Sequence, residues 1–448
     1  MWLRDEVCVT IFVKNVICVG LNIGFAYLCQ LIVAFLDISM EKHCHIIYLV
    51  LTLLVLSCSA ASLSAQEKVD SLSGGAKYVH RMGFDFRGAY VASSAHLDNY
   101  GFAHGESTVI HSAVSAHLKY SFSYTSATRL GRLYPGAYQG IGVGATSFFD
   151  NWRVGTPVNV YVFQGAPVKR LSRKLSIDYE WNFGASFGWE KYHTGMDPVN
   201  IVVGSDVNAY INLGFMLNYR FAKNWSLTAG LDMTHYSNGN TSWPNPGVNT
   251  IGGRVGMVYR FGGSGEPAAG AMPHEEFRPH MSYDLMAYCA ARKRMLFVGQ
   301  EGYDSYPELL PGRFGILGLN FAPMYNFNRY FRAGVSADFQ YDESSGLPKY
   351  WIEGTTGEDI KFYRPPYWKQ ISGGLSVRGE LVMPIFSINA GIGYNFFGSA
   401  DSRNCYQVLA LKVHVARSLF LNVGYQLNSF HNPNNLMLGI GYTFHNLR

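Results

Sequence analysis

Between residues 77 and 261, apolar and polar side chains alternate along one stretch of the chain after another. In the stretch 174–192, for example, Leu175, Ile177 and Tyr179 are separated by single polar residues. Successive side chains of a β-strand point to opposite faces of the sheet. The alternation therefore predicts strands with one apolar and one polar face.

These stretches fall into two series. Turn residues separate the stretches within each series, and one linker separates the two series. In the first series, eight stretches run over 78–92, 109–122, 139–148, 157–169, 174–192, 205–221, 224–237 and 249–261. In the second, about eight more run near 278–291, 313–327, 330–343, 368–383, 385–397, 405–416, 419–429 and 435–444. We therefore expect an all-β protein of about 16 strands, organised as two eight-strand halves.

The composition indicates that these strands cross a membrane. The chain is 48% hydrophobic and only 15% charged, and it holds 30 Tyr and 29 Phe. Beyond the N-terminal region it has no uninterrupted apolar run of the ~20 residues that a membrane helix needs. A closed barrel is the other structure that satisfies its backbone in lipid. The prediction is a transmembrane antiparallel β-barrel, and the weak net charge of +5 with no Lys/Arg block argues against a nucleic-acid partner.

The polar faces of the first half carry charges of both signs in balance. An eight-stranded barrel has an interior that side chains just fill, and buried charges must be paired. These charges therefore predict a plugged lumen, although a porin lining is a competing interpretation. The acids are Asp85, Asp178, Glu180, Glu190 and Asp232, and the bases are Arg81, Arg87, Arg220, Arg254 and Arg260.

The two halves are separated by residues 263–277, a segment with linker composition. The first half spans 77–262 and the second 278–448, and both end in similar Gly-containing strands, which suggests duplication. The pattern leaves open whether the halves form two small barrels or one wide barrel. It also leaves open whether Cys289 and Cys405 pair or remain free.

The N-terminal region has the order of a secretory signal. Residues 40–65 begin with a charged segment, continue with an apolar stretch and end in small residues. We expect a signal peptide there, with export to the outer membrane of a Gram-negative cell. Residues 1–39 are then surplus, and we interpret them as an extension from a mis-assigned start codon.

Candidate chemistry lies at one end of the barrel predicted for the first half. Short turns at 170–173 and 222–223 are typical of the periplasmic side, so the longer loop at 238–248 faces outside. His235 and Ser237 continue the apolar face of the strand that enters this loop, and Asn249 lies on the same face of the next strand. The three side chains are thus expected to face lipid near the outer leaflet.

These residue types fit nucleophilic catalysis on an ester. Same-face neighbours at i and i+2 lie about 6.5–7 Å apart, a gap that an imidazole can bridge to a hydroxyl. A serine needs an adjacent base, a third group fixes the imidazole tautomer, and polar donors must meet the oxyanion. Asn238 and Gly239, at the start of the loop, are candidates for the last role.

The sequence His-Tyr-Ser-Asn followed by Pro-Asn-x-Gly resembles the signature of the PagL-type lipid A 3-O-deacylases. The resemblance covers roughly residues 78–262. It implies an eight-stranded outer-membrane barrel without cofactor, whose substrate and partner is lipid A of lipopolysaccharide. It further implies that Ser237 is the nucleophile, that His235 is the base and that Asn238 contributes to the oxyanion hole. The family's acid lies fourteen residues after the His, where this chain has Asn249.

The alternative function is a non-enzymatic channel or structural surface barrel in which the motif is inert. The amide at position 249 and a wide barrel formed by both halves would favour it. A mixed protein is a third option, with an enzymatic first half and a second half that binds a partner or glycan through the loop 343–366.

Overall fold

The computed structural model describes residues 77–92, 110–192, 202–262, 277–298, 306–352, 360–399, 402–430 and 432–445. All of them belong to one compact unit, residues 67–448. The proposed extension 1–39 and signal peptide 40–65 lie outside the described residues, as does most of the linker 263–277.

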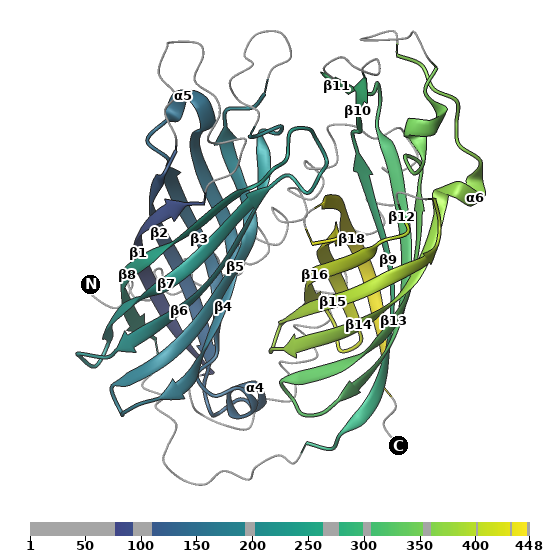
Figure 1. The fold of residues 1–448 in the computed structure, drawn as a ribbon. Helices are drawn as coiled ribbons and strands as arrows, with labels where there is room; N and C mark the ends of the chain where they lie inside the picture. Colours follow the sequence, from purple (N-terminus) through teal and green to yellow (C-terminus); the bar gives the residue numbers. More distant parts are fainter. Residues whose placement is uncertain are drawn as a thin grey trace, which may run out of the picture. The chain divides into compact units, whose positions relative to one another are not determined.

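The first half of the described chain forms a closed barrel by itself (Figure 1). Each strand pairs antiparallel with the next, and the last strand pairs with the first. The strands are β1 (Tyr78–Val91), β2 (Ser112–Tyr124), β3 (Tyr138–Ser147), β4 (Gly155–Arg170), β5 (Leu175–Trp189), β6 (Val207–Tyr219), β7 (Trp225–Ser237) and β8 (Val248–Phe261).

The two faces of the first barrel are those that the alternation predicts. On β7, Leu231 and Met233 are 70% and 60% exposed, whereas Thr228 and Asp232 between the outward positions are buried. An apolar exterior around a polar interior is the arrangement of a membrane barrel. The predicted fold class is confirmed.

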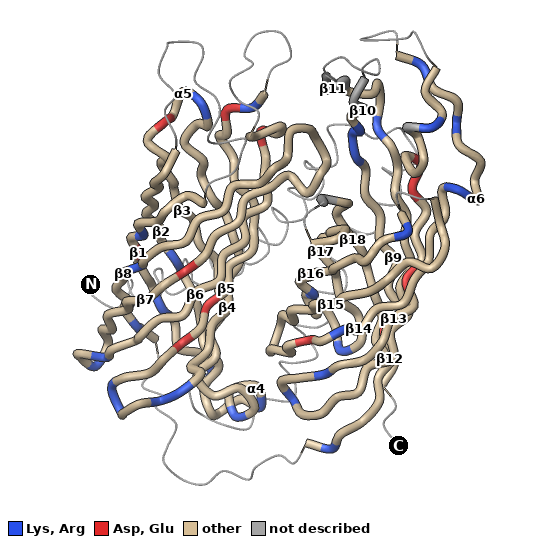
Figure 2. Tube along the Cα trace, in the orientation of Figure 1, with Lys and Arg blue, Asp and Glu red and all other residues tan. Residues whose placement is uncertain are grey.

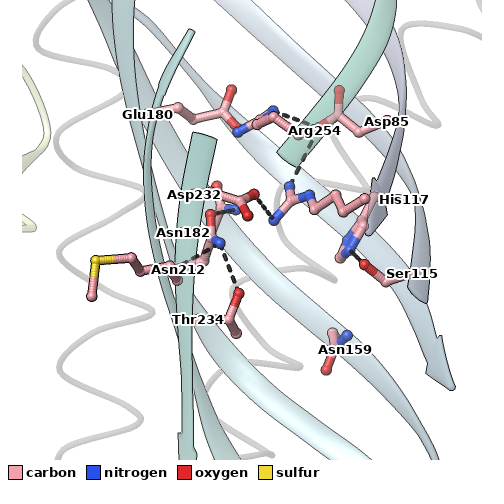
Figure 3. Close-up of polar contacts among 12 residues, drawn as sticks. Asp85, Ser115, His117, Asn159, Glu180, Asn182, Asn212, Asp232, Thr234 and Arg254 are labelled. Carbon is pink, nitrogen blue, oxygen red and sulfur yellow. Dashed lines mark hydrogen bonds and ion pairs between the residues drawn. The ribbon is translucent and has the colours of Figure 1, made fainter. Parts of the chain in front are cut away.

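Ion pairs fill the middle of the lumen (Figure 3). Arg254 Nη2 lies 2.5 Å from Asp85 Oδ2 and 3.0 Å from Glu180 Oε1. Lys119 Nζ bridges the same two carboxylates at 2.7 and 3.0 Å. Arg87 links Asp85 to Asp232 at 3.3 and 3.2 Å. Opposite charges from five strands thus neutralise one another across the interior.

Two charged residues differ from the predicted lumen set. Glu190 is exposed rather than internal, because β5 ends at Trp189 and the left-handed Gly188 (φ 84°) interrupts the alternation just before it. Lys119 was not in the predicted set, yet it is buried and central to the network.

The second half forms another closed barrel, so the two halves do not share one wide barrel. Its interior holds an analogous set, with Arg332 and Lys412 each contacting both Asp284 and Glu380 at 2.7–2.8 Å. Figure 2 marks the charged positions along both barrels. The strands are β9 (His280–Arg292), β12 (Phe314–Asn326), β13 (Phe331–Asp342), β14 (Ile371–Val382), β15 (Phe386–Phe397), β16 (Cys405–His414), β17 (Leu419–Asn428) and β18 (Asn432–His445).

The alternation pattern did not predict the short elements between strands. A separate hairpin, β10 (Met295–Val298) and β11 (Tyr306–Leu309), follows β9. The helical turns are α4 (Arg129–Leu133), α5 (Asn151–Val154), η1 (Leu347–Tyr350) and α6 (Tyr367–Gln370). None of the helices in the described ranges is long and apolar enough to cross a membrane. No disulfide joins Cys289 and Cys405.

Candidate active site

The candidate site lies where β7 and β8 meet their connecting loop, residues 238–247. This loop is at the same end of the first barrel as α5, opposite α4 and the short turns (Figure 1). His235 pairs in register with Asn249 of β8 on one side and with Ile211 of β6 on the other. The strands therefore bring the predicted base and its predicted orienting residue directly opposite each other.

The His235 ring and the Asn249 amide are hydrogen-bonded. His235 Nδ1 lies 2.7 Å from Asn249 Oδ1. An amide oxygen only accepts, so the bond assigns the proton to Nδ1 and leaves Nε2 as the basic nitrogen. Asn249 thus fixes the imidazole tautomer that a general base needs.

Ser237 is the last residue of β7 and lies opposite Ala209 of β6. It is two residues from His235 on the same outward side, and only 8% of its surface is exposed. Within the described residues, no hydrogen bond joins the Ser237 hydroxyl to the His235 ring. Catalytic hydrogen bonds are often long in unliganded enzymes and tighten when substrate binds.

Asn238 is fully buried, and its hydrogen bonds are directed into the loop. Its backbone N–H donates to Asn245 Oδ1 at 2.9 Å. Its side-chain amide donates to the carbonyls of Ser242 (2.9 Å) and Pro244 (3.3 Å). The Asn238 carbonyl accepts from the Thr241 hydroxyl at 2.9 Å. Both donor groups of Asn238 are engaged, so in this structure it organises the loop.

Two further residues complete the arrangement. The Asn245 carboxamide is held beside Ser237 because its Oδ1 accepts from the Asn238 backbone N–H, and its Nδ2 has no acceptor among the residues that the structure describes. Gly247, with φ 77°, packs against the imidazole, and a Cβ there would lie 2.9 Å from His235 Cε1. Both residues lie in the Pro-Asn-x-Gly part of the motif, but the sequence assigned neither of them a role in the site.

Gly239 supplies a backbone N–H group to the site rather than a side chain. It adopts a left-handed conformation with φ 64°. Its backbone N–H has no acceptor among the described residues. It therefore remains available to a developing negative charge next to Ser237.

The comparisons with known families cover both barrels. Residues 115–258 match the family model described as lipid A 3-O-deacylase (PagL). Residues 281–446 match the model described as acyloxyacyl hydrolase, C-terminal domain. The motif lies in the first barrel, and the second match extends the family resemblance to the second barrel.

The similar solved structures are distant in sequence. The N-terminal β-barrel domain of OprF from Pseudomonas aeruginosa is 13% identical, with a TM-score of 0.24, and the match covers 42% of this chain and 99% of that one. Neisserial surface protein A is 10% identical, with a TM-score of 0.26 and coverage of 41% and 96%. Likenesses this low carry no argument about the chain. No curated protein matches.

Proposed function

Because the chain is of the PagL type, an outer-membrane lipid A deacylase, we propose that it hydrolyses the 3-O-acyl ester of lipid A by a Ser–His mechanism. Ser237 is the nucleophile, His235 is the general base and Asn249 orients the base. The observation that carries the proposal is the 2.7 Å bond between His235 Nδ1 and Asn249 Oδ1, which turns Nε2 into the basic nitrogen two residues from Ser237.

The reaction has two halves. In the first, His235 Nε2 accepts the Ser237 proton while Oγ attacks the ester carbonyl carbon. The tetrahedral intermediate then collapses, the sugar oxygen leaves with the proton from His235, and the acyl group stays on Ser237. In the second half, water attacks the acyl-enzyme with His235 again as base, and a free fatty acid is released.

The negative charge of the tetrahedral oxygen needs donors on the Ser237 side. We assign this role to the Gly239 backbone N–H and the Asn245 side-chain amide. Asn238 contributes by holding the loop that carries both donors. Removing one such donor typically costs about 10²–10³-fold in kcat.

The surroundings fit a lipid substrate. Met233 and Ile251, one step toward the middle of the barrel from His235 and Asn249, are 60% and 52% exposed and apolar. An acyl chain can lie along these side chains while its ester reaches Ser237. The substrate's sugar then remains at the loop end, where a membrane barrel meets the outer-leaflet headgroups.

Position 249 holds an asparagine, whereas the family motif has an acid there. Asn249 can accept the Nδ1 proton bond, but it does not neutralise the imidazolium that forms during attack. We therefore expect slower chemistry than a carboxylate would support at the same position.

A covalent probe tests the mechanism on the purified full-length protein. An alkyl fluorophosphonate should label wild type on Ser237, as located by peptide mass spectrometry. Labelling should fall strongly in His235→Ala and disappear in Ser237→Ala. Labelling of another serine, or equal labelling of the His235→Ala variant, would overturn the assignment.

A further inference from the structure

Residues of the second barrel contact the part of the site loop that follows Ser237. The Asn240 side-chain amide donates to the backbone carbonyl of Asn434 at 2.8 Å. The Thr241 carbonyl accepts from the Lys293 backbone N–H at 3.3 Å. Asn240 and Thr241, three and four residues after the proposed nucleophile, are thus hydrogen-bonded to the second barrel, which has no assigned role in the reaction.

An apolar contact holds Gly239, the residue before Asn240. A Cβ built on Gly239 would lie 2.4 Å from Leu436 Cδ2, so the leucine side chain packs directly against the Gly239 backbone. Any larger residue at 239 would have to displace Leu436. Contacts with the second barrel therefore reach the residue whose N–H is a proposed oxyanion donor.

The contacting residues of the second barrel lie on neighbouring elements. Lys293 directly follows β9, and Asn434 and Leu436 are in β18. Strands β9 and β18 pair with each other, with Cys289 opposite Leu438. Lys293, Asn434 and Leu436 thus lie at one end of this strand pair, where the Arg292 guanidinium also donates to the Asn434 carbonyl at 2.9 Å.

The segment held by the second barrel includes one non-glycine residue with a left-handed backbone, Asn240. Gly239 and Asn240 both adopt positive φ, 64° and 62°. Glycine adopts this region freely, whereas an L-residue such as Asn240 enters it at a cost and keeps it where its surroundings fix it. The Asn434 carbonyl holds Asn240 through a hydrogen bond, and the Leu436 side chain packs against Gly239.

We infer that the end of the β9–β18 pair in the second barrel is a brace that positions the oxyanion-forming segment 239–241 of the first barrel. The brace touches no reacting atom, so Leu436 and Asn240 are positioning residues. This inference rests on the proposed function, because it gives the segment its catalytic meaning. The second barrel then takes part, as a positioning element, in the reaction proposed for the site in the first barrel.

The kinetic test uses the full-length chain and purified lipid A. Leu436→Ala removes the side chain behind Gly239, and Asn240→Gly keeps the left-handed backbone but loses the bond to Asn434. A small misplacement of catalytic groups lowers rates strongly, so each variant should lose roughly tenfold in kcat with KM nearly unchanged. Leu436→Met should recover most of the rate. Leu438→Ala, on the same face of β18, is the matched control and should behave like wild type.

A cross-link tests the contact without any activity. Asn240→Cys combined with Leu436→Cys should form a disulfide under mild oxidation, which joins the tryptic peptides 224–254 and 418–448. Neither peptide contains a native cysteine, so its identification is unambiguous. Asn240→Cys with Leu438→Cys should cross-link much less.

The outcomes separate the two proposals. An inactive wild type that still forms the 240–436 cross-link would reject the proposed function and leave the contact standing. An active wild type whose Leu436→Ala and Asn240→Gly variants keep full kcat would overturn the brace. Absence of the cross-link in folded protein would overturn it as well.

Discussion

Asn249 is the residue at which this chain departs most clearly from the family motif. The pattern of alternating faces was sufficient to predict that it shares a side with His235 and Ser237. The sequence did not reveal that β7 and β8 pair His235 directly with Asn249, because register depends on how long the loop is and how it folds. The 2.7 Å bond follows from that register.

Replacing Asn249 with Asp tests the role of this side chain. The two residues have the same shape, so the bond to His235 Nδ1 is retained while a negative charge is added. The charge stabilises the imidazolium that forms during attack, so kcat should rise about tenfold, because a triad with an amide in place of its acid is strongly impaired. Asn249→Ala should lower kcat instead. Equal rates for the Asp and Asn forms on purified lipid A would show that a charge at position 249 does not stabilise the imidazolium, and an unchanged kcat in Asn249→Ala would show that Asn249 does not orient the base.

At the scale of elements, the strands were predictable and the loop 238–247 was not. Strand positions follow from an alternation that lipid and lumen impose over ten or more residues. The loop is instead shaped by single hydrogen bonds, above all that from the Asn238 N–H to Asn245 Oδ1. Turn-forming residues indicate where such a loop begins and ends, but not which side chain closes it.

Asn245→Asp separates the two roles of this loop residue. The aspartate still accepts from the Asn238 N–H, so the loop keeps its closure. It loses the Nδ2 donor and places a negative charge near the oxyanion, so kcat should fall about 10²–10³-fold. Steady-state assays of Asn245→Asp and Asn245→Ala should both show this loss. A fully active Asp variant would remove Asn245 from the oxyanion hole.

At the scale of the whole molecule, each half closes on itself and fills its interior with charge pairs. Both barrels use two acids and two bases at the centre of this network. The balance of charges predicted a plugged lumen. Whether the halves shared one barrel was not predictable, because local alternation is identical in wide and narrow barrels.

Arg254→Met tests the buried network of the first barrel. Without the guanidinium, Asp85 keeps its ion pairs with Lys119 and Arg87, and Glu180 keeps its ion pair with Lys119 and the hydrogen bond from the Tyr138 hydroxyl. Removing one member of a buried ion pair costs about 3–5 kcal/mol, so the free energy of unfolding in detergent should fall by about that amount. Adding Glu180→Gln removes the uncompensated charge and should restore part of the loss. A single variant as stable as wild type would mean that the network contributes little.

The filled lumen also bears on the channel alternative. A cavity between Arg81, Lys119, Glu180 and Arg260 has a volume of about 30 Å³, room for about one water molecule. We therefore expect no single-channel conductance from the protein in a planar bilayer. Stable ion-conducting steps from pure protein would contradict the closed interior.

The lipid A of cells that express the protein tests the central claim most directly. Mass spectrometry should show loss of one 3-O-acyl chain with wild type and an unmodified spectrum with Ser237→Ala, when both proteins are folded in the outer membrane. Removal of the nucleophile typically lowers kcat by about 10⁴-fold or more, so no residual product should be visible. An unchanged spectrum with folded wild-type protein, or the same loss with Ser237→Ala, would contradict the account.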